Sequence, residues 1–221
     1  MDTSILKRYT LKEEILNSVT HGVGAVFALG GTVAMAVLAI INHSSAALIN
    51  GLIYGISLIL LYTMSTVYHA VTNIKAKEIL RIFDHASIFL LIAGSYTPFC
   101  LIALEGNPHG KIVAFAVWAC AIIGVVLNAI DLKKTEKLGI VLYVIMGWSC
   151  IAVIRDILAA LSTPAFWLLL AGGLCYTLGI IFYVMKKVRY MHGIWHIFVL
   201  AGSVLHFLCI SIYILLYFYR F

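Results

Sequence analysis

Long apolar stretches and short clusters of charged residues alternate along the chain. Runs such as Ala46–Leu61 and Ile140–Ile154 show no regular alternation of apolar and polar positions, which favours helices over the strands of a membrane β-barrel. A helix needs about 20 apolar residues to cross the hydrocarbon core of a bilayer. The pattern therefore predicts an all-α fold, a seven-transmembrane-helix bundle that forms a single integral-membrane domain over residues 1–221. The predicted spans lie at 19–42, 46–69, 82–104, 111–130, 138–154, 165–185 and 192–218.

The composition agrees with a membrane protein and excludes other classes. Of the 221 residues, 63% are hydrophobic and 11% are charged, whereas soluble domains are closer to one half apolar and one quarter charged. A secreted soluble, disordered, coiled-coil or nucleic-acid-binding chain is thereby excluded. Six of the first 17 residues are charged, and the apolar run that follows is too long for the core of a cleavable signal, so we expect the first span to remain as an anchor. The predicted location is the plasma membrane.

The positions of the basic residues predict the orientation. Twelve of the 15 lysines and arginines fall in the N-terminal tail and in the second-to-third, fourth-to-fifth and sixth-to-seventh connections, and three fall on the other side. Because positive charge is retained on the cytoplasmic side, the N-terminus is predicted to be cytoplasmic and the C-terminus outside. The net charge of +6 is read as this topology signal and not as a nucleic-acid patch.

Histidines inside the predicted spans are the most informative polar residues, because lipid tolerates ionisable groups poorly. His192 and His196 are four residues apart, which places both imidazoles on one face of the seventh helix. The predicted topology brings this helix start to the same depth as His69, at the end of the second span, and Asp84, at the start of the third. Three distant segments thus converge at the cytoplasmic level.

Three histidines with an open fourth position are a common catalytic zinc arrangement. We therefore predict a Zn²⁺ site formed by His69, His192 and His196. The ion would activate a water molecule that Asp84 orients or deprotonates. Ser65, four residues before His69 on the same helix face, would hydrogen bond that water or an oxyanion of the substrate.

Structural roles compete with several of these assignments. One alternative, less favoured than the role at the metal, is that Asp84 only caps the third helix. For Ser65 taken alone, a bond back to its own helix is favoured over a catalytic role. His85 must point to another face than Asp84 and is read as a packing residue. His21 either bonds a helix end or lines the same cavity, and His206, about 15 Å beyond His196 along the helix, lines a deeper wall or bonds another helix. The two remaining histidines, His43 and His109, are predicted to be surface residues.

Small residues and a proline predict how the helices pack and bend. Gly51 and Gly55 form a GxxxG pattern that allows a close helix–helix approach. Pro98 is predicted to kink the third helix near its outer end. The five cysteines lie in or near different spans without a CxxC pair, so packing and no disulfide are expected.

Five sequence segments together resemble the bacterial hemolysin III family, relatives of the progestin and adiponectin receptor family within a wider set that includes alkaline ceramidases. The segments are Glu14-Ile-Leu-Asn-Ser-Val-Thr-His21, Ser65-Thr-Val-Tyr-His69, Phe83-Asp84-His85-Ala-Ser-Ile, Ser95-Tyr-Thr-Pro98 and His192-Gly-Ile-Trp-His196. The resemblance covers essentially the whole chain. It implies seven membrane helices with the N-terminus inside, and zinc held by His69, His192 and His196. It also implies that Asp84 contacts the zinc through water, with Ser65 nearby.

The activity expected from the site and the resemblance is zinc-dependent hydrolysis of a lipid amide or ester, with a membrane lipid entering sideways as the substrate. One alternative is a pore-forming, hemolytic membrane protein, although no span shows a strongly polar, channel-lining stripe. Another is a receptor-like regulator of membrane state in which zinc is structural. A transporter is weaker still, because the histidines cluster at one depth instead of forming a path. The sequence leaves the oligomeric state open.

Overall fold

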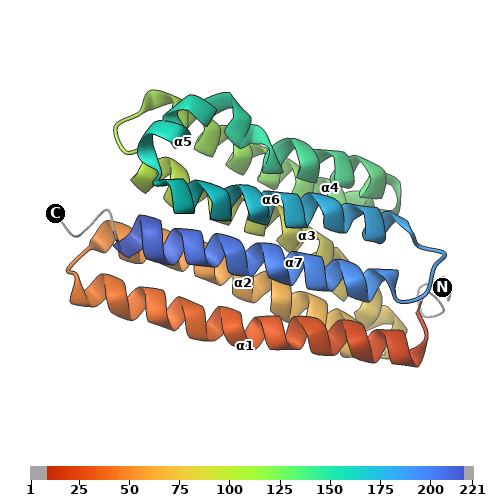
Figure 1. Ribbon diagram of the computed structural model, residues 1–221. Coiled ribbons are helices and arrows are strands. Elements are labelled where there is room, and N and C mark those ends of the chain that lie inside the picture. The colour runs from red at the N-terminus through yellow and green to blue at the C-terminus, as the bar shows by residue number, and fades with distance from the viewer. Residues whose placement is uncertain (1–8, 217–221) are drawn as a thin grey trace.

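The computed structural model describes residues 9–216, and they form a bundle of helices (Figure 1). The α-helices are α1 (Leu11–Ile41), α2 (Ser45–Ala70), α3 (Ile74–Pro98), α4 (Pro108–Gly147), α5 (Ile154–Ala160), α6 (Thr163–Val184) and α7 (Met191–Leu208). The π-helices η1 (Phe99–Ala103) and η3 (Cys209–Leu216) continue α3 and α7, and the 3₁₀-helix η2 (Ser149–Val153) joins α4 to α5. The all-α prediction is confirmed, and the last two residues of the predicted seventh span, 217 and 218, lie outside the described residues.

Within residues 9–216, six helical stretches are long and apolar enough to cross a membrane, and the longest of them is divided. This stretch, Pro108–Ala160, has 53 residues, whereas about 20 residues suffice for one crossing. Asp131 has φ −159° and ψ 86°, which breaks α4, and the chain reverses direction there (Figure 1). The protein is therefore a multi-pass membrane protein with six to seven long apolar helices.

The helix starts follow from side-chain caps. Thr10 and Glu13 form a reciprocal capping box that begins α1 at Leu11, and Asn73 caps α3 so that it begins at Ile74. Both helices therefore start about eight residues earlier than the apolar runs predicted. A hydropathy pattern predicts that a helix starts where the charged residues stop. In the structure, these two helices start at their caps and include the charged turns that precede the apolar runs. This extension is what brings acidic side chains of α1 to the site described below.

Helix α2 packs against α1 and α3, α4 packs against α3, α7 packs against α6, and α1 also packs against α7. The predicted close approach at the GxxxG pattern is present, because a Cβ added at Gly55 would overlap with the side chain of Thr32 on α1. At Gly51 the nearest side chains are those of Leu215 and Met35. Contacts of this kind draw α1, α2 and the C-terminal part of the chain together.

Two interruptions of helical geometry lie on one side of the bundle. The α-helix gives way to η1 directly after Pro98, as the proline predicted. The second interruption, between α4 and η2, has no proline. There the hydroxyl of Tyr96 donates to the carbonyl of Gly147 at 2.8 Å and accepts from the backbone N–H of Cys150 at 2.9 Å. Tyr96 thus satisfies two backbone groups that the broken helix would leave unpaired in an apolar setting.

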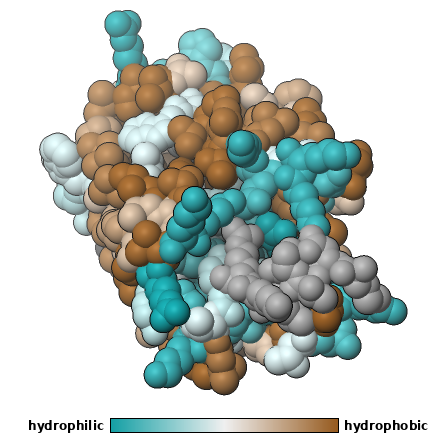
Figure 2. Space-filling model, turned by 90° about the vertical axis from the view of Figure 1, so that its right-hand side faces the viewer, coloured by the Kyte–Doolittle hydropathy of each residue, from teal (hydrophilic) through white to brown (hydrophobic). Residues whose placement is uncertain are grey.

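Polar residues gather at the end of the bundle where α1, α3 and α7 begin, which we call the N-terminal end. Figure 2 shows this end, with hydrophilic residues near its centre and hydrophobic residues around them. Glu136 pairs there with Arg81 at 3.2 Å and with Lys186 at 2.7 Å, and it accepts a hydrogen bond from Tyr183 at 2.9 Å. These contacts join α3, the second half of α4 and the region where α6 ends.

Candidate metal centre

Three histidines from two helices meet at the N-terminal end of the bundle. His69 lies in the last turn of α2, and His192 and His196 lie in the first two turns of α7. One ring nitrogen of each lies within 4.8 Å of the others, and His69 and His196 are buried while His192 is half-buried. The structure therefore brings together all three of the predicted metal ligands, although they are up to 127 positions apart in the sequence.

The ring nitrogens of this group suit a zinc ion. The Nε2 atoms of His69 and His192 are 3.3 Å apart, and two nitrogens of a tetrahedral zinc site lie about 3.3 Å apart at Zn–N distances of about 2.0–2.1 Å. His196 Nε2 is buried and has no hydrogen-bond partner among the described residues. A buried imidazole nitrogen without a partner is costly, and a cation shared with the other two histidines would satisfy it.

The ring of His196 is held by α1. Its Nδ1 lies 3.1 Å from the backbone carbonyl of Asn17 and 3.2 Å from the hydroxyl of Thr20. Since a carbonyl only accepts, Nδ1 carries the proton and donates to Asn17, and Nε2 is left with a free lone pair. The ring of His21 stacks on His196 with centroids 3.5 Å apart. Helix α1 thus fixes both the orientation and the tautomer of this ligand.

His69 is also anchored by a residue of α1. Its Nδ1 lies 2.6 Å from Oε2 of Glu14, and the other carboxylate oxygen lies 2.9 Å from the ammonium group of Lys77 on α3. The side chain of His69 is fully buried and that of Lys77 is 2% exposed. Sequence reasoning placed Glu14 in the tail and counted Lys77 as a loop charge, so it missed this contact. The only sequence signal was the position of Glu14 within the first family-like segment.

The start of α7 is tied to α1 as well. Tyr190, the residue before α7, has a left-handed backbone with φ 65°, which non-glycine residues rarely adopt. Its N–H donates to Oε1 of Glu13 at 2.9 Å. The ring of Tyr9 lies over the ligands, with its centroid 4.9 Å from that of His192 and 5.7 Å from that of His69. The N-terminal segment therefore both orients α7 and covers the centre.

Asp84 and Ser65 are both buried, but they are not part of the group formed by the three histidines. Asp84 is 4% exposed and lies ten residues into α3, which Asn73 caps, so the alternative that Asp84 caps this helix is wrong. The hydroxyl of Ser65, one turn before His69, has no hydrogen-bond partner among the described residues. It therefore does not bond back to its own helix and is available to another group.

The other histidines take separate positions. His21 is buried in the interior of α1 with both ring nitrogens unpaired among the described residues, so the helix-end alternative does not apply. His85 bridges α3 and α6 through Arg81 O at 3.0 Å and the hydroxyl of Tyr183 at 3.2 Å, as expected of a packing residue. His206 bonds the carbonyl of Leu169 on α6 at 3.1 Å.

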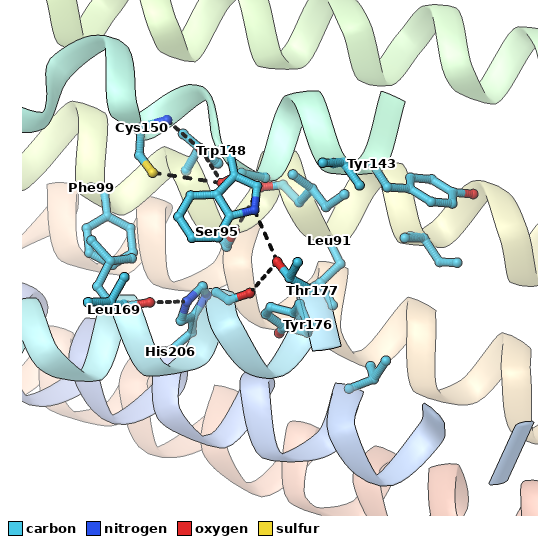
Figure 3. A pocket seen from close by; sticks show the side chains of 18 of the residues that line it. Leu91, Ser95, Phe99, Tyr143, Trp148, Cys150, Leu169, Tyr176, Thr177 and His206 are labelled. Atoms are coloured by element: carbon cyan, nitrogen blue, oxygen red, sulfur yellow. Dashed lines mark hydrogen bonds between the residues drawn. The ribbon is translucent and has the colours of Figure 1, made fainter. Parts of the chain in front are cut away.

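A cavity of about 210 Å³ runs through the bundle beside the centre. Its walls are mostly apolar and come from α3, η1, the second half of α4, α5, α6 and α7. His21 and Asp84 line it at the N-terminal end, and His206 and Cys100 line it farther along. Figure 3 shows its middle part, where the indole N–H of Trp148 reaches the hydroxyl of Thr177 on α6 at 3.1 Å.

Comparison with known proteins gives a consistent result. Residues 9–207 match the family model described as haemolysin-III related. The chain is 40% identical over 205 residues to the hemolysin-3 homolog of Bacillus subtilis, covering 93% of this chain and 96% of that protein. It is 38% identical over 205 residues to hemolysin-3 of Bacillus cereus, covering 93% of each. It is 28% identical over 211 residues to the human monocyte to macrophage differentiation factor, covering 93% of this chain and 86% of that protein.

Proposed function

The chain belongs to the haemolysin-III-related family, and from this premise we propose that it is a zinc-dependent membrane hydrolase that cleaves an amide or ester bond of a lipid. The observation that carries the proposal is the buried group of His69, His192 and His196. Imidazole nitrogen is a preferred zinc ligand, and three protein ligands leave a fourth position for chemistry. When bound there, zinc supplies Lewis acidity and an activated water.

The neighbouring polar residues have roles in this proposal that match their positions. Asp84, buried on the cavity wall, orients the attacking water and receives its proton. Ser65 carries a buried hydroxyl without a partner, and this hydroxyl donates to the oxygen of the scissile carbonyl as negative charge develops on it. His21 closes the cavity wall next to His196 and excludes bulk water from this region.

The shape of the cavity supports a lipid as substrate. Asp84 and Cys100 both line it and are 16 residues apart along α3 and η1, which corresponds to roughly 24 Å at the α-helical rise. One acyl chain spans half of the hydrocarbon core, or about 15 Å. An acyl chain can therefore lie along the apolar walls while its carbonyl group stays at the Asp84 end.

Metal content and turnover test the proposal together. The protein, purified in detergent without chelator, is expected to contain about one zinc per chain, and His192→Ala should lose it. His109→Ala, which changes an exposed histidine in the first turn of α4, should keep the zinc. A zinc-free wild-type protein would sink the proposal. A zinc-loaded protein that cleaves no lipid amide or ester in a broad screen would remove the hydrolase part.

A second candidate is a receptor-like regulator in which the zinc is structural. The observation in its favour is the burial of the centre, since His196 is fully buried and His69 is 3% exposed. In this case chelation lowers the unfolding temperature strongly while no lipid is turned over. Dye leakage from liposomes that persists without zinc would instead support a pore-forming activity of the kind that the name of the Bacillus cereus relative suggests.

A further inference from the structure

The contact between Glu14 and His69 is shorter than the polar contacts of His196 with Asn17 and Thr20. At 2.6 Å it has the short distance of a charge-assisted hydrogen bond. It joins helices whose residues are 55 positions apart, and the side chain of His69 is fully buried. A bond this short to a fully buried imidazole restricts the rotation of the ring.

The chemistry of the bond selects one tautomer of His69. A carboxylate only accepts, so Nδ1 carries the proton and Nε2 keeps its lone pair. Nε2 is the atom that lies 3.3 Å from Nε2 of His192. The carboxylate therefore presents the metal-facing nitrogen of His69 in the form that binds a cation.

Lys77 holds the carboxylate in place. Its ammonium group contacts Oε1 of Glu14 at 2.9 Å and donates to the backbone carbonyls of Tyr68 at 2.9 Å and Val71 at 3.3 Å. All three donors of this buried lysine are thus used. Because Tyr68 and Val71 flank the last turn of α2, the same lysine also fixes the turn that carries His69.

A second carboxylate at the same end provides a matched comparison. Glu136 has the same 14% side-chain exposure as Glu14 and also pairs with a largely buried cation, Arg81. Its partners include Arg81, Tyr183 and Lys186, and none of these three is a histidine of the centre. If Glu14 has only a structural role, removing its charge should change zinc affinity as much as removing the charge of Glu136. If Glu14 acts at the metal, the two changes should have different effects on zinc affinity.

We propose that Glu14, held by Lys77, is a positioning residue of the metal centre that orients His69 and fixes its tautomer. The proposal rests on the proposed zinc centre and adds a functional residue from α1, a helix that contributes no ligand. Carboxylates behind metal-bound histidines typically account for 10-fold to 100-fold of the metal affinity. The interaction of Glu14 therefore links metal binding to the packing of α1 against α2 and α3.

The test compares Zn²⁺ affinities of the full-length protein in detergent, measured by competition with a chromophoric chelator. Glu14→Gln, which keeps the shape but removes the charge, is expected to weaken zinc binding about 10-fold or more. Glu136→Gln is expected to change it by less than about threefold. Thermal unfolding without zinc is measured in parallel, and the two variants should lose similar amounts of stability.

The outcomes separate the positioning role from the centre itself. If wild-type protein binds zinc and Glu14→Gln binds it equally well, the positioning role is wrong and the centre stands. If Glu136→Gln weakens binding as much as Glu14→Gln, the effect is structural and the positioning role is again wrong. If wild-type protein binds no zinc, both proposals fail. Should Glu14→Gln not fold, Glu14→Asp keeps the charge but withdraws it from His69, and unchanged zinc affinity in that variant overturns the proposal.

Discussion

Replacing Tyr96 with phenylalanine should destabilise the protein at the break between α4 and η2. The hydroxyl of Tyr96 accepts from the N–H of Cys150 and donates to the carbonyl of Gly147. The ring of Tyr96 is buried, and both hydrogen bonds are partly buried. Tyr96→Phe keeps the ring and removes both hydrogen bonds.

The expected cost follows from these two bonds. An N–H left without an acceptor in an apolar setting costs about 1–3 kcal/mol, and the lost donation to a carbonyl about 0.5–1.5 kcal/mol. We therefore expect a loss of about 2–4 kcal/mol in the free energy of unfolding. Tyr143→Phe is the comparison, because the hydroxyl of Tyr143 donates to the carbonyl of His85 at 2.9 Å and its second hydrogen bond is with the side chain of Asn128, so no backbone N–H loses its acceptor. The lost donation to His85 should cost about 0.5–1.5 kcal/mol.

Reversible unfolding in mixed detergent micelles, followed by tryptophan fluorescence, measures both variants on one scale. The reasoning predicts that Tyr96→Phe is clearly the less stable of the two. A loss below about 0.5 kcal/mol for Tyr96→Phe, smaller than the cost of a single buried bond, would refute the idea that its hydroxyl completes the backbone of the fifth span.

Three further predictions concern the cavity and the centre. Gly172→Ala should cost about 1–3 kcal/mol of stability, because the new methyl group overlaps the imidazole of His206. Gly173→Ala, whose methyl group meets nothing within 4 Å, should be neutral or slightly stabilising. Thermal unfolding of both variants tests this difference. Asp84→Asn should keep the bound zinc and lose lipid turnover about 100-fold or more, so an unchanged rate argues against its role with water. Chelation should lower the unfolding temperature, and adding zinc at about 100 times its dissociation constant should restore about 2.7 kcal/mol; identical melting curves would contradict this.

Much of the fold and the ligand set could be predicted from the sequence because the bilayer makes both patterns strong. Apolar runs of the required length predicted the helices, and the HxxxH spacing together with His69 predicted the three candidate ligands. The change from α-helix to π-helix after Pro98 falls where the sequence predicted an interruption, since proline lacks the N–H that continues a helix. These features depend on local chemistry and on depth in the membrane alone.

The features that the sequence did not reveal depend on contacts between helices. The fifth span was predicted as one helix over 138–154, but it breaks at Gly147, and only the distant Tyr96 explains why this break is tolerated. Likewise, Glu14 and Lys77 read as ordinary charges near a membrane surface. Their burial became visible only once the capped start of α1 placed Glu14 beside His69.

The distribution of the three histidines over α2 and α7 has a consequence for how the protein is made. His69 and His192 are separated by 123 positions, and the second of them is synthesised with the final helix. When α1 to α6 have been synthesised and inserted into the membrane, only one of the three candidate ligands, His69, is therefore present. A zinc ion bound afterwards would act as a cross-link that closes this long segment, and closing a loop of about 100 residues removes about 4.7 kcal/mol of chain entropy from the unfolded state in a simple polymer treatment. Complete chains would thus bind the metal and gain this stability, whereas chains truncated before α7 would not.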